Sequence, residues 1–163
     1  MLQVLDESIE LDKAYRGQVL EYNQKKKEIY RLQGNKSAYI EQLWKLVLEQ
    51  SAGDLDIYKE LKAQYSEKEW LIKREELFKK LPANAHIDRL YKEEKLYDRL
   101  LAYVLKSSGL YAVQSYENVL KKEYPKQILS KYQDEVNKMA SCTGNRKHYA
   151  DPVSYTHLTL PTN

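Results

Sequence analysis

The chain has 163 residues, with 27 basic against 24 acidic side chains and a formal net charge of +3. This is the length of one domain, and a charge so close to balance is too mild to indicate nucleic-acid binding as the main function. Charged residues make up 31% and hydrophobic residues 42%, with only five Gly and four Pro. That composition indicates long amphipathic helices rather than a protein rich in loops.

The number of cysteines and the hydropathy of the sequence indicate in which compartment we expect the protein. The single cysteine, Cys142, excludes an internal disulfide and a multi-cysteine metal site, and it suits a reducing cytosol. No apolar run approaches the roughly 20 residues that a membrane-spanning helix needs. The first ten residues also lack the basic and then apolar pattern of a secretion signal. We therefore expect a cytoplasmic protein without a membrane partner.

Capping residues predict where helices begin and end along the chain. Asp54 and Asn84 are predicted N-caps, and Pro125 suits the first position of a helix. Three glycines follow apolar-periodic stretches, where a left-handed residue can end a helix. These glycines are Gly34, Gly53 and Gly109.

The strongest local signal is a capping box at Ser66 and Glu69. In this motif each side chain accepts a hydrogen bond from the other residue's backbone N–H at the start of a helix. Tyr65 and Trp70 occupy the two positions of a hydrophobic staple around that start. The sequence therefore predicts a helix that begins after Ser66.

Within these limits the apolar residues recur with the period of helices that bury one face. Linkers of a few residues between such helices make neighbouring helices antiparallel. The predicted helices cover residues 6–15, 18–33, 36–50, 55–65, 67–81, 85–94, 96–107, 110–123 and 125–140, and a further helix begins near residue 145.

The predicted helix pairs recur at an almost constant interval. Pairs open near Asp6, Lys36, Ser66, Leu96 and Pro125, at steps of 29 or 30 residues. Such a period is typical of a helical-repeat array. We predict an all-α fold in which residues 1–151 form about five antiparallel hairpins, stacked as a TPR-like right-handed α-solenoid segment. The alternative is a non-repetitive bundle of average-length helices, which would give a similar spacing.

The C-terminal residues 152–163, PVSYTHLTLPTN, differ from the rest of the chain. They contain no Lys, Arg, Asp or Glu, and their pattern has a period of two. The stretch resembles the translation of a sequencing adapter, which implies a non-native tail to be excluded from reasoning about the fold. The alternative is a genuine disordered tail.

Three segments resemble a known family: EKEWLIKREELFKKL, LYKEEKLYDRLLAYVL, and YPKQILSKYQDEVNKMA followed by GNRKHY. They are similar to the TPR-like helical region toward the C-terminus of bacterial SWIM-type zinc-finger proteins. The zinc motif of that family, Cys-x-Cys followed by Cys-x-His, is absent here. The resemblance implies the repeat part of a larger bacterial protein whose zinc module lies elsewhere, and it assigns no zinc ligand to this chain.

The sequence offers little for catalysis. His86, His148 and Cys142 lack the spacing of metal ligands, and a nucleophilic pair of Cys142 and His148 has no group to orient the imidazole. The neighbouring Glu75 and Glu76 point about 100° apart on a helix, so they do not converge on one substrate atom. Because glycine-rich phosphate loops are also missing, we predict no enzymatic activity, no metal and no cofactor.

Binding is therefore the predicted function, as a non-catalytic protein-binding or scaffold module. The chain has 15 Tyr against one Phe, and aromatic residues concentrate binding energy, although helix packing accounts for most of them. The candidates for a protein or peptide partner are Tyr91, Tyr97, Tyr103 and Tyr116. A further expected partner is the remainder of a longer chain.

The alternative function is a nucleic-acid-associated accessory region, based on the basic surplus of residues 121–147. Four residues there are candidates for contact with phosphate or an acidic partner: Lys121, Lys122, Arg146 and Lys147. An earlier run, Lys25 to Lys27, is predicted to be a solvated helix face.

Overall fold

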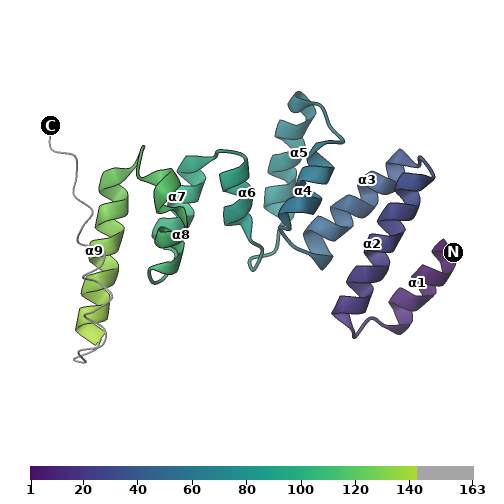
Figure 1. Ribbon diagram of the computed structural model, residues 1–163, viewed down its shortest axis with the longest axis horizontal. Helices are drawn as coiled ribbons and strands as arrows, with labels where there is room; N and C mark the ends of the chain where they lie inside the picture. The colour runs from purple at the N-terminus through teal and green to yellow at the C-terminus, as the bar shows by residue number, and fades with distance from the viewer. Residues whose placement is uncertain (143–163) are drawn as a thin grey trace. The chain divides into compact units, whose positions relative to one another are not determined.

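The computed structural model describes residues 1–142, and helices are the only regular secondary structure in that range (Figure 1). The predicted all-α class is confirmed. The described chain divides into two compact units: unit 1 is Met1–Glu93 and unit 2 begins at Glu94. The predicted helix near residue 145 and the tail 152–163 lie outside the described residues. None of the helices described is long and apolar enough to cross a membrane.

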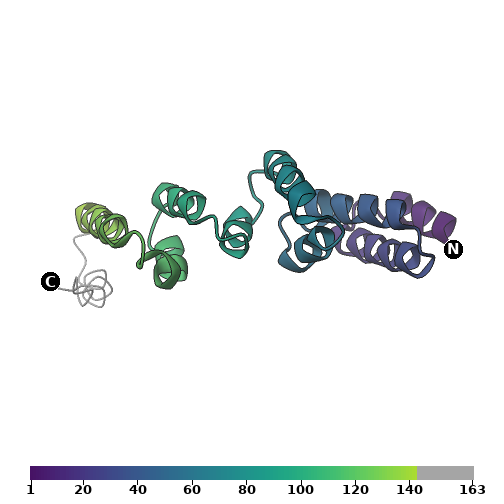
Figure 2. The ribbon, with the colours of Figure 1, turned by 90° about the horizontal axis from the view of Figure 1, so that it is seen from above.

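Unit 1 is built from consecutive helices that pack against their neighbours in the chain. Its α2 lies between α1 and α3, and α4 packs against α3 and α6 (Figures 1 and 2). The elements are α1 (Leu2–Leu11), α2 (Arg16–Leu32), α3 (Lys36–Lys45), the π-helical turn η1 (Leu46–Gln50), α4 (Leu55–Lys62), α5 (Glu67–Lys80) and α6 (Ile87–Glu93).

The first helix differs from its predicted range. It begins at Leu2 rather than at residue 6, and it ends at Leu11 because the next residues turn: the Tyr15 N–H donates to the Asp12 carbonyl at 2.7 Å. The interval from Leu2 to the start of the next hairpin at Lys36 is therefore 34 residues. The constant spacing predicted for the hairpins does not hold at this end.

The predicted N-caps of unit 1 have mixed outcomes. The capping box is confirmed, with the Ser66 N–H donating to Glu69 Oε2 at 3.0 Å and the Ser66 side chain accepting from the Glu69 N–H. Asp54 is confirmed as the N-cap of α4. The N-cap predicted at Asn84 is wrong, because α6 begins only at Ile87. The chain first makes a turn at Pro82, whose carbonyl accepts a hydrogen bond from the N–H three residues on.

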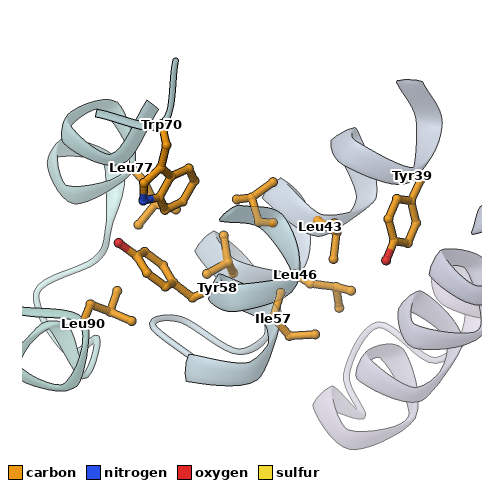
Figure 3. Close-up of a cluster of buried hydrophobic side chains, with 10 residues drawn as sticks. Tyr39, Leu43, Leu46, Ile57, Tyr58, Trp70, Leu77 and Leu90 are labelled. Atoms are coloured by element: carbon orange, nitrogen blue, oxygen red, sulfur yellow. The ribbon is translucent and has the colours of Figure 1, made fainter. Parts of the chain in front are cut away.

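The core of unit 1 is centred on aromatic packing. Tyr58 of α4 is fully buried, and Figure 3 shows the side chains of Trp70, Leu77 and Leu90 gathered around it. The Tyr58 and Trp70 rings meet edge to face, with centroids 5.1 Å apart. The rings of Tyr65 and Trp70 lie 6.0 Å apart, which confirms the predicted staple contact. Edge-to-face aromatic pairs add about 0.5–1.5 kcal/mol beyond area burial, so this cluster fixes α4 against α5.

Unit 2 contains α7 (Tyr97–Lys106), α8 (Tyr111–Leu120) and α9 (Pro125–Cys142). Consecutive helices again pack together, α7 with α8 and α8 with α9. Pro125 occupies the first position of α9, as predicted. The buried side chains come from all three helices and include Leu100, Val104, Val113, Leu120 and Ile128.

A close backbone approach in unit 1 depends on one glycine. Gly53, in the turn between η1 and α4, is buried and has a φ of +76°. A Cβ atom at this position would lie 3.0 Å from the backbone nitrogen of His86, in the loop that leads into α6. Gly34 has a similar φ of +67°, but a Cβ atom there would meet nothing within 4 Å. Alanine at either position would be strained by the positive φ, but only at Gly53 would its Cβ atom also meet another backbone segment.

We predict that Gly53→Ala destabilises unit 1 more than Gly34→Ala does. Both changes place a side chain in the left-handed region, at a cost of about 1–2 kcal/mol. Only the change at Gly53 also pushes two loops apart, so its loss should be larger by at least about 1 kcal/mol. Urea unfolding followed by Trp44 and Trp70 fluorescence, which reports on unit 1 alone, measures both. Equal losses would show that the loop contact contributes nothing.

Candidate protein-binding groove

The tyrosines predicted for binding are distributed over both units. Tyr91 belongs to α6 of unit 1, where its ring meets Phe78 edge to face with centroids 5.2 Å apart. Tyr97 and Tyr103 are half-buried on α7 of unit 2. Tyr116 of α8 is only 7% exposed, so it belongs to the core of unit 2 and not to its surface. Tyr116 therefore contributes to helix packing, which was the alternative to a binding role for the tyrosines.

Some lysines of the predicted basic stretch, residues 121–147, already contact other residues of the chain. Lys121 lies 3.5 Å from Glu117 on the same helix face, and Lys122 is exposed. Lys131 is buried and therefore cannot reach a phosphate group in this conformation. Arg146 and Lys147 lie outside the described residues. Between residues 121 and 142 the chain has five lysines against three acidic residues, so the surplus in the described part is small.

The lysine run on α2 is not the solvated face that its sequence predicts. Lys26 is buried, and its Nζ atom lies 2.5 Å from Asp6 Oδ1 on α1. Lys27 Nζ lies 2.7 Å from Glu60 Oε2 on α4. Only Lys25 is exposed, with its ammonium group over the Tyr22 ring. The prediction was wrong for Lys26 and Lys27 because each has a partner on another helix, which a local pattern does not reveal.

Glu60 joins a third helix to this contact. The Tyr39 hydroxyl of α3 donates a hydrogen bond to Glu60 Oε1. Burial and the neighbouring carboxylate both raise the pKa of Tyr39 well above its usual value, so the hydroxyl stays protonated and remains a donor. The side chains of Lys27 and Tyr39 therefore hold α2 and α3 to α4.

A buried amide pair fixes α2 to α3. Gln42 Nε2 donates to the side-chain oxygen of Asn23 at 2.9 Å and to its backbone carbonyl at 3.1 Å. Asn23 Nδ2 in turn donates to the Val19 carbonyl at 2.7 Å. Because an unpaired buried amide costs about 1–3 kcal/mol, these bonds specify one register between the two helices.

Beside this pair lies a groove of about 420 Å³ between α2 and the face of α3 and η1. We call it the α2–α3 groove. Tyr30 of α2, Trp44 of α3 and Leu48 of η1 supply its large apolar side chains, and Gln42 is one of its buried walls. Its volume is within the range of about 300–1,000 Å³ typical of ligand pockets. Charged residues of both signs border it, among them Lys45 and Glu49.

Two residues that do not line the groove, Tyr65 and Lys80, contact the Trp44 side chain. Trp44 Nε1 donates to the Tyr65 hydroxyl at 2.9 Å. On the same ring, the Lys80 ammonium lies 5.7 Å from the centroid, within cation–π range. Leu48 and Glu49 belong to the π turn, a local departure from the α-helix that is often found at functional sites. These contacts fix the position of the Trp44 ring in the wall of the groove.

Sequence patterns indicated the helix of this groove but not the groove itself. Trp44 of α3 and Leu48 of η1 lie on the apolar side of the helix predicted for residues 36–50. Each follows a fully buried residue, Leu43 or Val47, but is itself only partly buried. An apolar stripe broader than one helix contact is a signal for such a surface. The π turn has no comparable signal. In the described range, no group of three or more His, Cys, Asp or Glu side chains is placed to hold a metal ion.

Unit 2 has a buried ionic contact of its own. Lys131 Nζ lies 2.8 Å from Glu135 Oε1 and donates to the carbonyls of Leu105 and Ser107 at the C-terminal end of α7. Glu135 Oε2 accepts a hydrogen bond from the Gly109 N–H at 3.0 Å. Hydrogen bonds from Lys131, and then from Lys138, lower the pKa of Glu135 to about 2. This pair fixes the α7–α8 turn against α9.

Comparisons with known proteins identify no relative. No protein family model matches the chain, and no curated protein or solved structure matches it significantly. The similarity to the helical region of SWIM-type proteins therefore stays a prediction.

We predict that unit 2 loses stability in acid through Glu135. Its folded pKa is about 2, below the ordinary value of 4.5, so the carboxylate stabilises the fold above about pH 4.5 and this contribution is lost as pH falls toward 2. Glu135→Gln removes one partner of a buried pair, so it should cost about 3 kcal/mol at pH 7 and flatten the acid dependence.

Urea unfolding between pH 3 and 7, followed by NMR amide signals of α8, separates unit 2 from unit 1. The neighbouring exposed carboxylate gives the control: Asp134→Asn should change stability by less than about 0.5 kcal/mol. An unchanged acid dependence in Glu135→Gln would contradict the assignment.

Proposed function

We propose that the chain is a non-catalytic protein-binding or scaffold module, in which the α2–α3 groove takes an apolar anchor of a peptide segment from a partner protein. The observation that supports this is the groove itself, with Tyr30, Trp44 and Leu48 along one hollow on unit 1. Aromatic and aliphatic side chains in a concave surface, bordered by charges of both signs, suit a peptide with an apolar anchor and polar flanks.

Preorganisation supports binding as the function. The Asn23–Gln42 amide bonds and the Trp44–Tyr65 hydrogen bond hold the groove's walls before any partner arrives. Binding then costs less side-chain entropy, because immobilising a mobile side chain costs about 0.5–1.5 kcal/mol. A groove that is held in this way can retain affinity even over a small contact area.

The architecture we propose for each unit is a TPR-like right-handed solenoid segment, as part of a larger cytoplasmic bacterial protein. It is supported by the order of packing, in which each helix contacts the next along the chain: α1, α2 and α3 in unit 1, and α7, α8 and α9 in unit 2. Stacks of this kind generally expose extended concave surfaces to their partners.

We predict that peptides selected on the full chain from a phage-displayed random library will depend on Leu48. Leu48→Ala removes the apolar side chain that η1 contributes to the groove. In fluorescence anisotropy titrations, this change should lower the affinity of the selected peptides about tenfold, or by about 1.4 kcal/mol. The matched control is Leu71→Ala, which shortens an exposed leucine of α5 away from the groove and should leave affinity unchanged.

The selected peptides should also perturb the Trp44 side-chain signal in NMR spectra, since this ring lines the groove. Circular dichroism and tryptophan fluorescence establish that both variants remain folded. Peptides that bind Leu48→Ala as tightly as the parent chain, while leaving Trp44 unperturbed, would remove the groove as the binding site.

A further inference from the structure

The outer side of α1 exposes apolar side chains. Val4 is 60% exposed and Leu11 is 83% exposed, and at 100° per residue the two lie within about 20° of each other around the helix. Leu2, Leu5 and Ile9 are partly buried and lie on a different side of the helix, so the apolar arc of α1 is wider than its contact with α2. We call the side with Val4 and Leu11 the α1 outer face.

A shallow hollow continues this face toward α2. It has a volume of about 540 Å³ and lies between α2, which contributes Ile29, and the start of α1, where the N-cap Met1 and Leu5 line it. Met1 is one of the most exposed apolar residues of the described chain. Met1 lies three residues before Val4, or about 60° around the helix, so it places the edge of the hollow beside the α1 outer face. Contiguous exposed apolar surface of this kind typically marks an interaction site.

The charge around this surface is acidic. Within Leu2–Leu11, α1 carries Asp6, Glu7 and Glu10 and no basic residue. From α2, the hollow is bordered by the exposed Glu21 and by Lys25, whereas Glu28 at its border already pairs with Arg31 at 2.7 Å. This local sign is opposite to the net charge of +3 of the whole chain. A partner selected by this surface is therefore basic, whereas the overall charge would favour an acidic one.

The inner side of α1 already packs against a helix that carries a run of lysines, α2. α2 packs there and presents a lysine run, from which Lys26 Nζ reaches Asp6 Oδ1 at 2.5 Å. The chemistry is an apolar helix contact with an ammonium–carboxylate pair beside it. On the outer face, Glu7 is the corresponding carboxylate, exposed next to Val4 and Leu11.

We propose that the α1 outer face, together with the adjoining α1–α2 hollow, binds an amphipathic helix of a partner protein with an apolar stripe and basic flanks. The partner helix lays its stripe over Val4, Leu11 and Met1, and its lysines or arginines meet Glu7 on α1 and Glu21 at the border of the hollow. This is the helix-in-groove mode of recognition. The site differs from the α2–α3 groove in residues, chemistry and partner, so each can fail without the other.

The test compares two labelled synthetic helices of about 18 residues, or five turns. Both carry the same leucine stripe; one has lysine flanks and the other glutamate flanks. In fluorescence anisotropy titrations with the full chain, the lysine peptide should bind at least about tenfold more tightly, and its affinity should fall with added salt. Because the chain has a net charge of +3, non-specific attraction would give the opposite order.

Variants at exposed positions assign the binding to α1. The double change Val4→Gln and Leu11→Gln should weaken the lysine peptide about tenfold or more, whereas Ile72→Gln, at an exposed apolar position on α5, should not. Glu7→Lys with Glu10→Lys should remove the preference for the lysine peptide. Circular dichroism and tryptophan fluorescence confirm that each variant is folded.

Three outcomes would overturn the proposal. The first is equal binding of the two peptides, and the second is unchanged binding to the Val4 and Leu11 double variant. The third is sedimentation equilibrium of the chain alone showing a dimer that the same double variant dissociates, which would make a second copy the occupant of this face.

Discussion

The Glu60 carboxylate holds three helices of unit 1 in one arrangement. It lies on α4, accepts a hydrogen bond from Tyr39 of α3, and pairs with Lys27 of α2 at 2.7 Å. An ammonium group taken out of water is costly unless it is paired, so α2 can bury this face only where Glu60 meets Lys27. The apolar core drives the helices together, the contacts of Glu60 fix α2 and α3 to α4, and the Asn23–Gln42 hydrogen bonds set the register of α2 against α3. The α2–α3 groove lies beside these contacts, with Gln42 among its lining residues.

Tyrosine hydroxyls bonded to carboxylates recur between the helices of both units. Each of these tyrosines belongs to a different helix or turn from its carboxylate, and the ring fills space while the hydroxyl satisfies the acid. The hydrogen bond to Asp98 raises the pKa of Tyr124 to about 12, as expected for a donor to a charged acceptor. The pairs besides Tyr39–Glu60 are Tyr22–Asp12, Tyr132–Glu117 and Tyr124–Asp98. They give a structural reason for four of the 15 tyrosines, because phenylalanine at these positions would remove the hydroxyl that donates to the carboxylate.

The sequence predicts those features of the fold whose causes are local. The capping box at Ser66 and the N-cap at Asp54 involve residues within one helical turn, and both are present in the structure. The predicted cap at Asn84 failed because a turn at Pro82 competes for the same stretch. Lys26 and Asp6 are 20 positions apart, and no local pattern distinguishes a lysine with such a partner from one that faces water. Trp44 and Leu48 are apolar in the sequence, but their partial exposure in the groove depends on how α2 packs against α3 and η1.

The charge of the surface also differs from the charge of the sequence. Lys26, Lys27 and Lys131 all count toward the net charge of +3, yet each is paired with a carboxylate inside its unit and contributes little to the outside. Pairs of this kind remove equal numbers of both signs from the surface, so what remains depends on the side chains that the packing leaves exposed. Around α1 these are mainly acidic, although the chain as a whole is weakly basic. Over distances longer than about 8–10 Å, physiological salt screens the rest of the molecule, so an approaching partner responds to the local charge of α1 and not to the total.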